Sequence, residues 1–308
     1  MANVMKLGTS VSSRIAVVVA AALAVAVAPL AAQDFEPNRL SDGKPDLNGI
    51  WQALNEANYD LELHMARASM QLREGPHGPL PAAEVLNFGA VGSVPPGMGV
   101  IKGGGNIPYT DAAAAKKMEN MANWSTRDQE VFCYLPGVPR ATYMPQPFQI
   151  FHSENAVFIA YQYAGAVRDI YMEDPKPSQV DSWMGTSYGR WEGDTLVVDV
   201  SGLLAKDCAE RAEDMPGCGG WLDRSGNHYS NQVQVEERYT LAGPNHMHYE
   251  ATLTDPMTYT EPWTIEMPLY RRMEPNARLM DFRCVEFVEE LMYGEYRRNP
   301  LPRMKLVD

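Results

Sequence analysis

From Phe148 onward, apolar and polar residues alternate with a period of two, which is the period of a β-strand with one buried face. Turn residues, such as those at 192–194 and 243–245, separate neighbouring runs. Because short connections place consecutive strands side by side, the pattern predicts a mainly β fold built as an antiparallel meander. The expected strands lie near residues 148–153, 156–163, 167–172, 187–192, 195–200, 232–241, 246–254, 262–270 and 278–285.

A meander of this length has two edge strands whose backbone groups lack partners. Closing the sheet removes both edges. We therefore expect a closed or nearly closed up-and-down barrel of the lipocalin-like type, with a two-sheet sandwich as the alternative.

Two helices are expected before the strands, because apolar residues recur there at helical spacing. One places Leu61, Met65, Ala68 and Leu72 on one face, and the other places Ala114, Met118 and Met121 on one face behind a cap at Thr110 or Asp111. Between them, residues 75–108 are dense in Gly and Pro. Such a segment is expected to be an irregular surface loop or a mobile lid over a pocket.

The N-terminus has the pattern of a secretory signal peptide: Lys6 and Arg14, an apolar run over residues 15–30, and small residues up to Ala32. The run is shorter than the roughly 20 residues that cross a bilayer, which makes a retained anchor the weaker alternative. We expect cleavage after Ala32 and a periplasmic or secreted protein. The predicted domains are a signal peptide (1–32) and one β-rich domain (33–308), with a helical and loop part (33–147) and a strand meander (148–308).

The charge balance argues against two classes of partner. Residues 1–32 carry two of the 26 cations and no acidic residue, so the expected mature chain has 24 Lys and Arg against 39 Asp and Glu, a net charge of −15. Such a surface repels nucleic-acid phosphates and anionic lipid. We expect no nucleic-acid partner and no stable membrane insertion after signal cleavage.

The four cysteines are candidates for two disulfides, because exported proteins fold in oxidising compartments. Four cysteines allow three pairings. Cys208 and Cys218 flank an acidic loop with Pro and Gly, which favours that pair together with Cys133 and Cys284. No Cys-x-x-C spacing is present, so the cysteines indicate no metal site.

Several motifs carry a resemblance to a known family. The main one is Arg-Trp-Glu-Gly-Asp-Thr-Leu-Val-Val-Asp at 190–199, and others lie at 45–51, 136–140, 182–185, 237–239 and 255–263. Together they resemble a large family of secreted bacterial proteins whose reaction is uncharacterised. In that family the Trp-Met-Gly stretch is usually followed by His-Ser, whereas this chain has Thr186-Ser187. A role for that histidine therefore does not carry over, while Gly226-Asn227-His228 keeps His228 as a candidate.

Strand alternation places three charged residues on otherwise apolar faces: Glu237, Glu286 and Arg168. Burying an isolated charge is costly unless it is paired or changes its pKa. One interpretation is a structural ion pair of Arg168 with Glu237 or Glu286. The other is a cavity in which a desolvated carboxyl acts as general acid or base and Arg168 holds an oxygen atom of the substrate.

Further candidates lie around the expected barrel mouth. Asp223 and His228 in the 201–231 loop are expected to form an acid–base pair over the Glu237 cavity, or else to be solvated. Aromatic residues and one arginine are candidates for ligand binding, although each is also a common packing residue: Tyr171, Trp183, Trp221, Tyr163 and Arg140.

The usual signatures of nucleotide, flavin and zinc-protease sites are absent from the sequence. His246 and His248 share a strand face and could bind a metal, but that face continues with polar residues, which favours a solvated surface. We expect neither a metal nor an organic cofactor. The leading hypothesis is an exported lyase, isomerase or hydrolase acting by acid–base chemistry on a small hydrophobic or aromatic molecule. The alternatives are a non-catalytic binding protein for such a molecule and a structural envelope protein.

Overall fold

The computed structural model describes residues 35–66, 74–75, 78–79, 95–206 and 220–285. The chain divides into two compact units, Met1–Glu36 and Pro37–Asp308, and the helices and strands below belong to the second. The predicted signal peptide and three candidate residues, Cys208, Cys218 and Glu286, lie outside the described residues. Across the described ranges, every helix is too short or too polar to cross a membrane.

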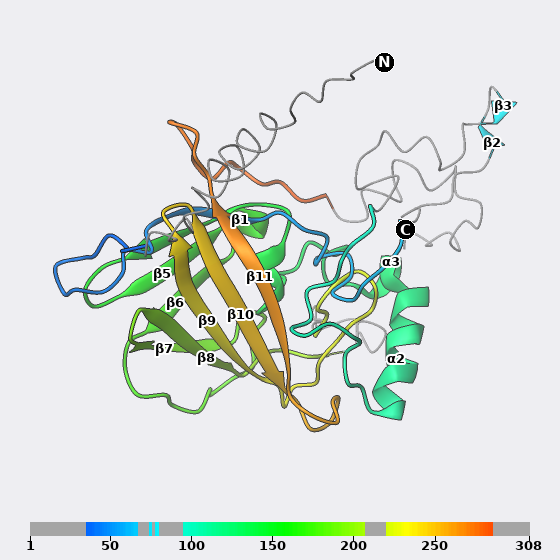
Figure 1. The fold of residues 1–308 in the computed structure, drawn as a ribbon. Helices are drawn as coiled ribbons and strands as arrows, with labels where there is room; N and C mark the ends of the chain where they lie inside the picture. The colour runs from blue at the N-terminus through cyan, green and yellow to red at the C-terminus, as the bar shows by residue number, and fades with distance from the viewer. Residues whose placement is uncertain (1–34, 67–73, 76–77, 80–94, 207–219, 286–308) are drawn as a thin grey trace, which may run out of the picture. The chain divides into compact units, whose positions relative to one another are not determined.

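Nine strands close into one barrel in the order β1-β11-β10-β9-β8-β7-β6-β5-β4 (Figure 1). The predictions of a mainly β fold and a closed barrel are confirmed, and the sandwich alternative is wrong. The strands are β1 (Gly49–Ala53), β4 (Phe148–His152), β5 (Val157–Tyr161), β6 (Val167–Tyr171), β7 (Thr186–Glu192), β8 (Thr195–Ser201), β9 (Gln234–Gly243), β10 (His246–Thr254) and β11 (Trp263–Arg271).

The strand that closes the barrel is β1, not the predicted strand at 278–285. Trp51 is paired with Phe148 of β4 and with Arg271 of β11, both antiparallel. Five residues are too short a run for the alternation to be recognised in the sequence. Residues 278–285 form no strand, and Met280 is 68% exposed, because β1 already occupies the edge of β11 that they would need.

The barrel also departs from a pure meander between β6 and β7. These strands pair in parallel over two positions, Ile170 with Ser187 and Tyr171 with Tyr188, whereas the other neighbours in the barrel are antiparallel. A parallel pair requires a crossover connection, which residues 172–185 provide. The β7–β8 hairpin keeps the predicted turn, with Gly193 at a φ of 60° that favours glycine.

The helical part differs from the prediction. Residues 61–66 are not helical, because Val100 donates a backbone hydrogen bond to Leu61 and His64 forms a bridge with Gly97. The remainder of that predicted helix, residues 67–72, lies outside the described residues. The second helix is present as α2 (Asp111–Ala122), with the Thr110 side chain capping it as predicted.

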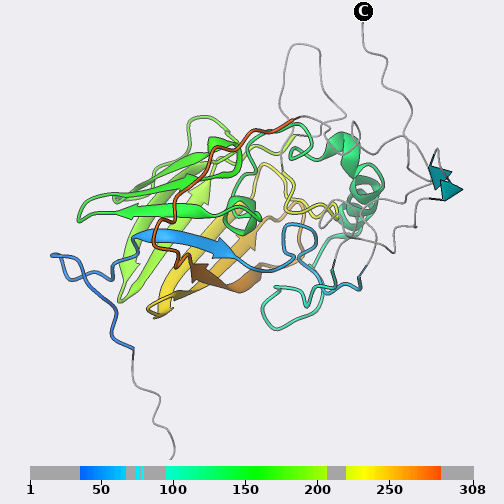
Figure 2. The same ribbon diagram turned by 90° about the horizontal axis from the view of Figure 1, so that it is seen from above.

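Helix α2 turns a different face inward from the one expected. Its buried residues are Ala113 and Asn120, whereas Ala114 is exposed and Met118 is 57% exposed. The reason is that α2 lies beside the barrel, as both ribbon views show (Figures 1 and 2), and its inward face packs against the loop at Gly226. It is followed by the short helix α3 (Trp124–Arg127).

Residues 100–102 of the Gly/Pro-rich segment pair with β11 of the barrel. Ile101 forms a bridge with Ile265, and the Lys102 backbone amide donates to the Thr264 carbonyl at 2.9 Å. At these positions the segment is bound along the strand rather than forming a free lid, and residues 80–94 lie outside the described residues. Nearby in sequence, β2 (Glu74–Gly75) and β3 (Gly78–Pro79) pair with each other.

The barrel interior is filled by the side chains of alternate strand positions. On β10, for example, Met247, Tyr249, Ala251 and Leu253 are completely buried, as the alternation predicts. Two short 3-10 helices, η3 (Arg140–Tyr143) and η4 (Tyr163–Gly165), lie in the connections before β4 and β6. The interior is thus largely filled by side chains, and most polar groups in it bond to one another, although Arg168 Nη1 and the Tyr161 hydroxyl have no hydrogen-bond partner.

Candidate functional site

Arg168 and Glu237 form an ion pair inside the barrel, 3% and 0% exposed. Arg168 comes from β6 and Glu237 from β9, each on the inward face that the alternation predicts. Arg168 also donates from Nε to the Ser187 hydroxyl at 2.7 Å. Burial lowers the pKa of the guanidinium, but the neighbouring carboxylate outweighs this and raises the pKa well above its ordinary value.

Two tyrosines complete the coordination of the carboxylate. Tyr239 and Tyr249 donate their hydroxyls to Glu237 Oε1, at 2.9 and 2.7 Å. Their rings are 5.0 Å apart, and burial together with the nearby carboxylate raises the pKa of both phenols well above 10. Both hydroxyls therefore keep their protons at neutral pH, so the cluster is a set of fixed donors around one acceptor.

This arrangement matches the structural ion-pair interpretation. Each carboxylate oxygen of Glu237 is bonded, and the side chains that bond it are completely or almost completely buried. A general acid or base must reach a substrate proton at hydrogen-bonding distance. Glu237 is enclosed by the packed core, so it does not meet that condition in this conformation.

A second buried cluster lies in the loop layer, by which we mean residues 57–62, 124–143 and 220–230. Arg140 is completely buried and binds both oxygens of Asp128, at 2.6 and 2.9 Å. It also donates to Glu130 at 2.7 Å and to the side-chain oxygen of Asn58 at 2.9 Å. Arg224 binds Glu130 through two further bonds of 2.9 Å. Arg140 was predicted to bind a ligand, but its guanidinium group is bonded to side chains of the protein instead.

The electrostatics of this cluster differ between its two carboxyl groups: at Asp128 burial outweighs the attraction of Arg140 and raises the pKa, whereas Glu130 is held ionised. Although burial by itself would raise the pKa of Glu130, Arg224 and Arg140 outweigh it and lower that pKa to about 2. The same balance raises the pKa of Arg140 above its ordinary value. Two arginines and two carboxylates give a network without excess charge, which is how buried charges are stabilised.

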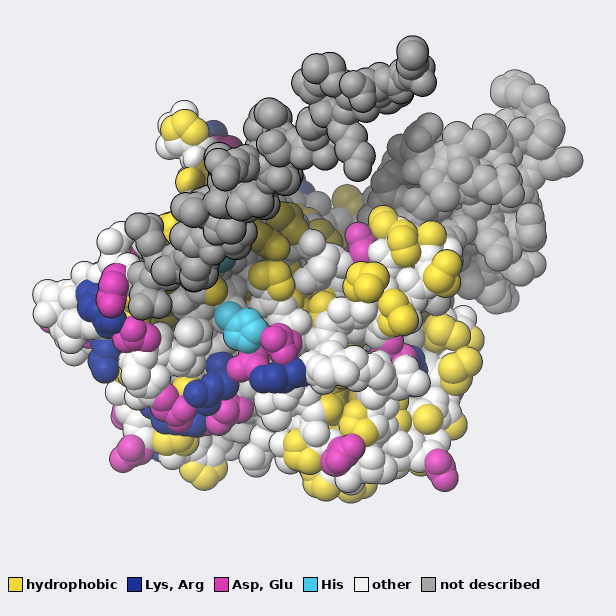
Figure 3. All heavy atoms as spheres, viewed as in Figure 1, with side chains coloured by type: hydrophobic (Ala, Val, Ile, Leu, Met, Phe, Trp, Pro, Cys, Tyr) yellow, Lys and Arg dark blue, Asp and Glu magenta, His cyan; other side chains and the backbone are white. Residues whose placement is uncertain are grey.

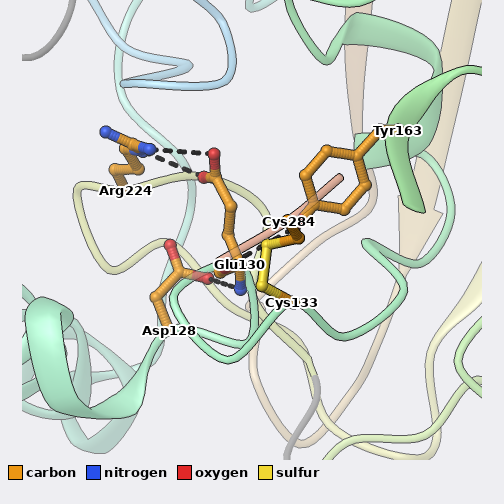
Figure 4. The surroundings of a disulfide bond; sticks show 6 residues. All are labelled: Asp128, Glu130, Cys133, Tyr163, Arg224 and Cys284. Atoms are coloured by element: carbon orange, nitrogen blue, oxygen red, sulfur yellow. Dashed lines mark hydrogen bonds and ion pairs between the residues drawn. A yellow bond between two sulfur atoms is a disulfide. The ribbon is translucent and has the colours of Figure 1, made fainter. Parts of the chain in front are cut away.

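The predicted disulfide between Cys133 and Cys284 is present next to this cluster (Figure 4). It joins residues 151 positions apart and ties the segment after β11 to the loop layer. Tyr163 contacts both joined segments: its hydroxyl donates to the Glu130 backbone carbonyl at 3.3 Å, and its ring centroid is 4.9 Å from that of Phe282. The predicted pair Cys208 and Cys218 lies outside the described residues.

Asp223 occupies the other side of the loop layer. Its carboxylate accepts backbone hydrogen bonds from Leu61, Ser225 and Asn227, and a 2.6 Å bond from the Asn227 side chain. Complete burial, reinforced by the nearby charge of Asp60, raises the pKa of Asp223 to about 7. It is therefore half-protonated near neutral pH, although its contacts are those of a residue that organises loops.

His228 does not form the predicted pair with Asp223. Its Nδ1 is 3.3 Å from the Gly226 carbonyl, and its ring stacks on Tyr109 at 5.4 Å. Burial lowers the pKa of His228 to about 4, so the ring is neutral at physiological pH. The predicted Asp–His pair is wrong because backbone amides, which need partners when they are buried, take the Asp223 oxygens first.

The aromatic residues predicted to bind a ligand do not converge. Trp221 is buried in the loop layer and Tyr163 is buried in η4. Trp183 packs against Tyr134 with ring centroids 5.3 Å apart, and Tyr171 is 48% exposed on the outer wall. Each has packing partners from a different part of the fold. The predicted interior cavity lined by these residues is thus replaced by separate packing roles.

The outer faces of β7 to β11 carry a ladder of charged side chains, visible in the space-filling view around one histidine (Figure 3). Arg190 and Arg238 both pair with Glu236 and Glu192. Further along, His248, Glu250 and Glu266 place one ligand atom each within 4.8 Å of one another. Lys102 already pairs with Glu250, which agrees with the expected solvated surface.

Three adjoining clefts lie on the outer surface of β7 to β10, with volumes of about 340, 600 and 490 Å³. We call them together the outer trough. Neighbouring clefts are joined by the residues that line both, namely Pro175, Tyr188 and Asp199 for the first two, and Ser201, Gln234 and Thr254 for the last two. The crossover connection, with Pro175 and Pro177, forms one wall.

The trough offers both apolar and polar groups. Tyr188 lies 5.7 Å from the exposed ring of Tyr171, which gives one end an aromatic character. Among the described residues, the side chains of Ser201, Gln234 and Thr254 have no hydrogen-bond partner. Ser201 and Gln234 lie just beyond the end of the β8–β9 ladder, and each pairs with its other neighbouring strand. These three side chains are therefore free to bond a ligand.

Comparisons of the chain with protein-family models, with curated proteins and with solved structures found no match. Sequence reasoning did not select Asp60, Asp128 or Glu130, because they lie in irregular segments where no period shows which side chains are buried. It also did not select Ser201 and Gln234, although alternation predicts that they point outward.

Proposed function

We propose that the protein is an exported, non-catalytic binding protein whose ligand lies in the outer trough. The observation that carries this proposal is the contrast between two sets of polar groups. Inside the barrel, the Glu237 carboxylate is held by Arg168, Tyr239 and Tyr249. In the trough, the side chains of Ser201, Gln234 and Thr254 have no hydrogen-bond partner among the described residues.

The size and lining of the trough support a small organic ligand. Clefts of about 340 to 600 Å³ fall within the range of ligand pockets, roughly 300–1,000 Å³. Tyr188 and the two prolines supply apolar surface, and Gln234 and Thr254 supply hydrogen-bonding groups. A ligand with an apolar face and a polar rim fits this lining.

The test is a screen of small aromatic and apolar molecules by thermal shift and calorimetry on the purified mature protein. Gln234→Arg places a long cation in the middle of the trough, and Ala242→Arg places the same side chain on the same strand outside it. Ligands are expected to bind the wild type and Ala242→Arg, and to bind Gln234→Arg at least tenfold more weakly. Equal binding to both variants would place the site elsewhere.

A second candidate function is acid–base catalysis, as a lyase, isomerase or hydrolase, and one observation favours it. Burial and the nearby Asp60 raise the pKa of Asp223 to about 7, so it can give or take a proton at neutral pH. Because Asp223 is completely buried and both its oxygens are bonded, this function requires the loop layer to open around it. Untargeted metabolite turnover by the wild type and by Asp223→Asn tests it. A product formed by the wild type and reduced at least a hundredfold in the folded variant would establish this function.

A further inference from the structure

We infer that the ligand of the outer trough is a neutral oligosaccharide that runs through all three clefts. This inference rests on the proposed binding function and names its ligand class. The three clefts are joined end to end through shared lining residues. Because each cleft alone is large enough for a small ligand, their continuity fits a chain of similar units better than a single compact molecule.

The paired strands under the trough favour a ligand that is bound by side chains rather than by backbone groups. The backbone groups of β7, β8, β9 and β10 are paired with one another in antiparallel ladders. An extended peptide binds a sheet by adding a strand to an unpaired edge, and the middle of a paired sheet offers no such edge. A ligand here must therefore bond to outward-pointing side chains, which favours one with many hydroxyl groups.

The free side chains match the chemistry of sugar hydroxyls. Ser201 and Thr254 each offer one donor and acceptor, and Gln234 offers an amide with both functions. A sugar hydroxyl also donates and accepts, so it can pair with each of them. The apolar face of a sugar ring can pack on the part of the Tyr188 ring that lines the first two clefts.

Charge selects a neutral glycan over an acidic one. Asp199 and Glu236 line the trough, and both carboxylates are bonded to Arg190, which leaves further lone pairs to accept from hydroxyls. The expected mature chain has 15 more acidic than basic residues and repels polyanions. Pro175 and Pro177 hold one wall with fixed backbone φ angles, which lowers the entropy lost when a ligand is bound.

The experiment measures binding of neutral oligosaccharides of glucose, xylose, galactose and N-acetylglucosamine, from one to six units long, by calorimetry on the purified mature protein. At least one series is expected to bind with a Kd that falls at least tenfold between one and four units. Gln234→Arg is expected to raise the Kd of the tetramer at least tenfold, and Ala242→Arg to change it less than twofold.

The outcomes separate this inference from the proposed function. If no neutral oligosaccharide binds while another small molecule binds in a Gln234-dependent way, the glycan assignment is wrong and the trough remains the binding site. If an oligosaccharide binds equally to Gln234→Arg, both proposals fail for the trough. A Kd that does not change with chain length would also overturn the inference, because it would restrict binding to a single cleft.

Discussion

Two buried arginine clusters hold this protein together, and they differ in how the fold assembles them. Arg168 lies between regular strands and shares one carboxylate with two tyrosine hydroxyls. Arg140 lies among loops and binds two carboxylates, one of which is shared with a second arginine. The barrel cluster thus lies between strands that are already held by backbone hydrogen bonds. In the loop layer, the ion pairs themselves connect segments that are not paired as strands.

The loop cluster is therefore expected to be the more sensitive of the two. Arg140→Leu leaves the buried carboxylate of Asp128 without its main partner and removes one partner from Glu130. We expect a loss of at least about 3–5 kcal/mol in the free energy of unfolding, the scale for breaking a buried pair. Urea denaturation measures it. Arg140→Lys keeps a charge but not the planar fork and should lose less; a loss below about 1 kcal/mol in Arg140→Leu would contradict the comparison.

The barrel cluster is tested by Glu237→Gln, which keeps the shape of the side chain and removes its charge. Because Arg168 is left as an unpaired buried cation, we expect the free energy of unfolding to fall by about 3 kcal/mol. This is the lower end of the range for a broken buried pair, because the amide oxygen still accepts hydrogen bonds from Tyr239 and Tyr249. Glu236→Gln is the matched control, one position away on the opposite face of β9. Equal losses in both variants would mean that the strand register is wrong.

The pH dependence of stability sharpens the description of the loop layer. Between about pH 4 and 7, folded Asp223 keeps a proton that the unfolded chain has lost, so its effect makes stability fall as pH rises. His228 acts oppositely: between about pH 4 and 6.5 the unfolded imidazole holds a proton and the folded one does not, so stability rises with pH. Each effect approaches about 1.4 kcal/mol per pH unit.

These opposed effects predict variants with opposite slopes relative to the wild type. In Asp223→Asn the falling contribution is removed, so stability should rise more steeply from pH 4 to 6.5. In His228→Gln the rising contribution is removed, so stability should fall more steeply over the same interval. Thermal or urea unfolding at half-unit pH steps measures both. Slopes that shift in the same direction in the two variants would contradict these assignments.

The smallest effect is expected on the barrel's outer wall. Arg238 pairs with Glu192 at 2.7 Å and Glu236 at 3.1 Å, but these groups are 31–44% exposed. Water and salt screen such pairs, so Arg238→Ala should cost about 0.2–1 kcal/mol, and less in high salt. Urea denaturation at two salt concentrations checks it. A cost equal to that of Arg140→Leu would show that the outer wall, too, depends on its ion pairs.

The sequence by itself determined the β fold and the inward faces of the strands. It favoured the pairing of Cys133 with Cys284 among three possible pairings, and the structure shows this disulfide. Because side chains alternate between the two faces of a strand, the sequence alone shows which residues share a face. Arg168 and Glu237 were placed on apolar faces in this way. The signal peptide and the fate of residues 1–32 stay predictions, since they lie outside the described residues.

Only the tertiary structure decided which strand closes the barrel and whether the buried charges meet a cavity or each other. A five-residue strand such as β1 is selected by the free edges of β4 and β11, and this information lies 100 to 220 residues away in the chain. In the same way, Asp223 binds the backbone of Leu61 rather than His228, because buried amides of distant segments compete for its oxygens. Local patterns show which side chains share a face of a strand or helix. Which other segment packs against that face depends on contacts between residues far apart in the chain.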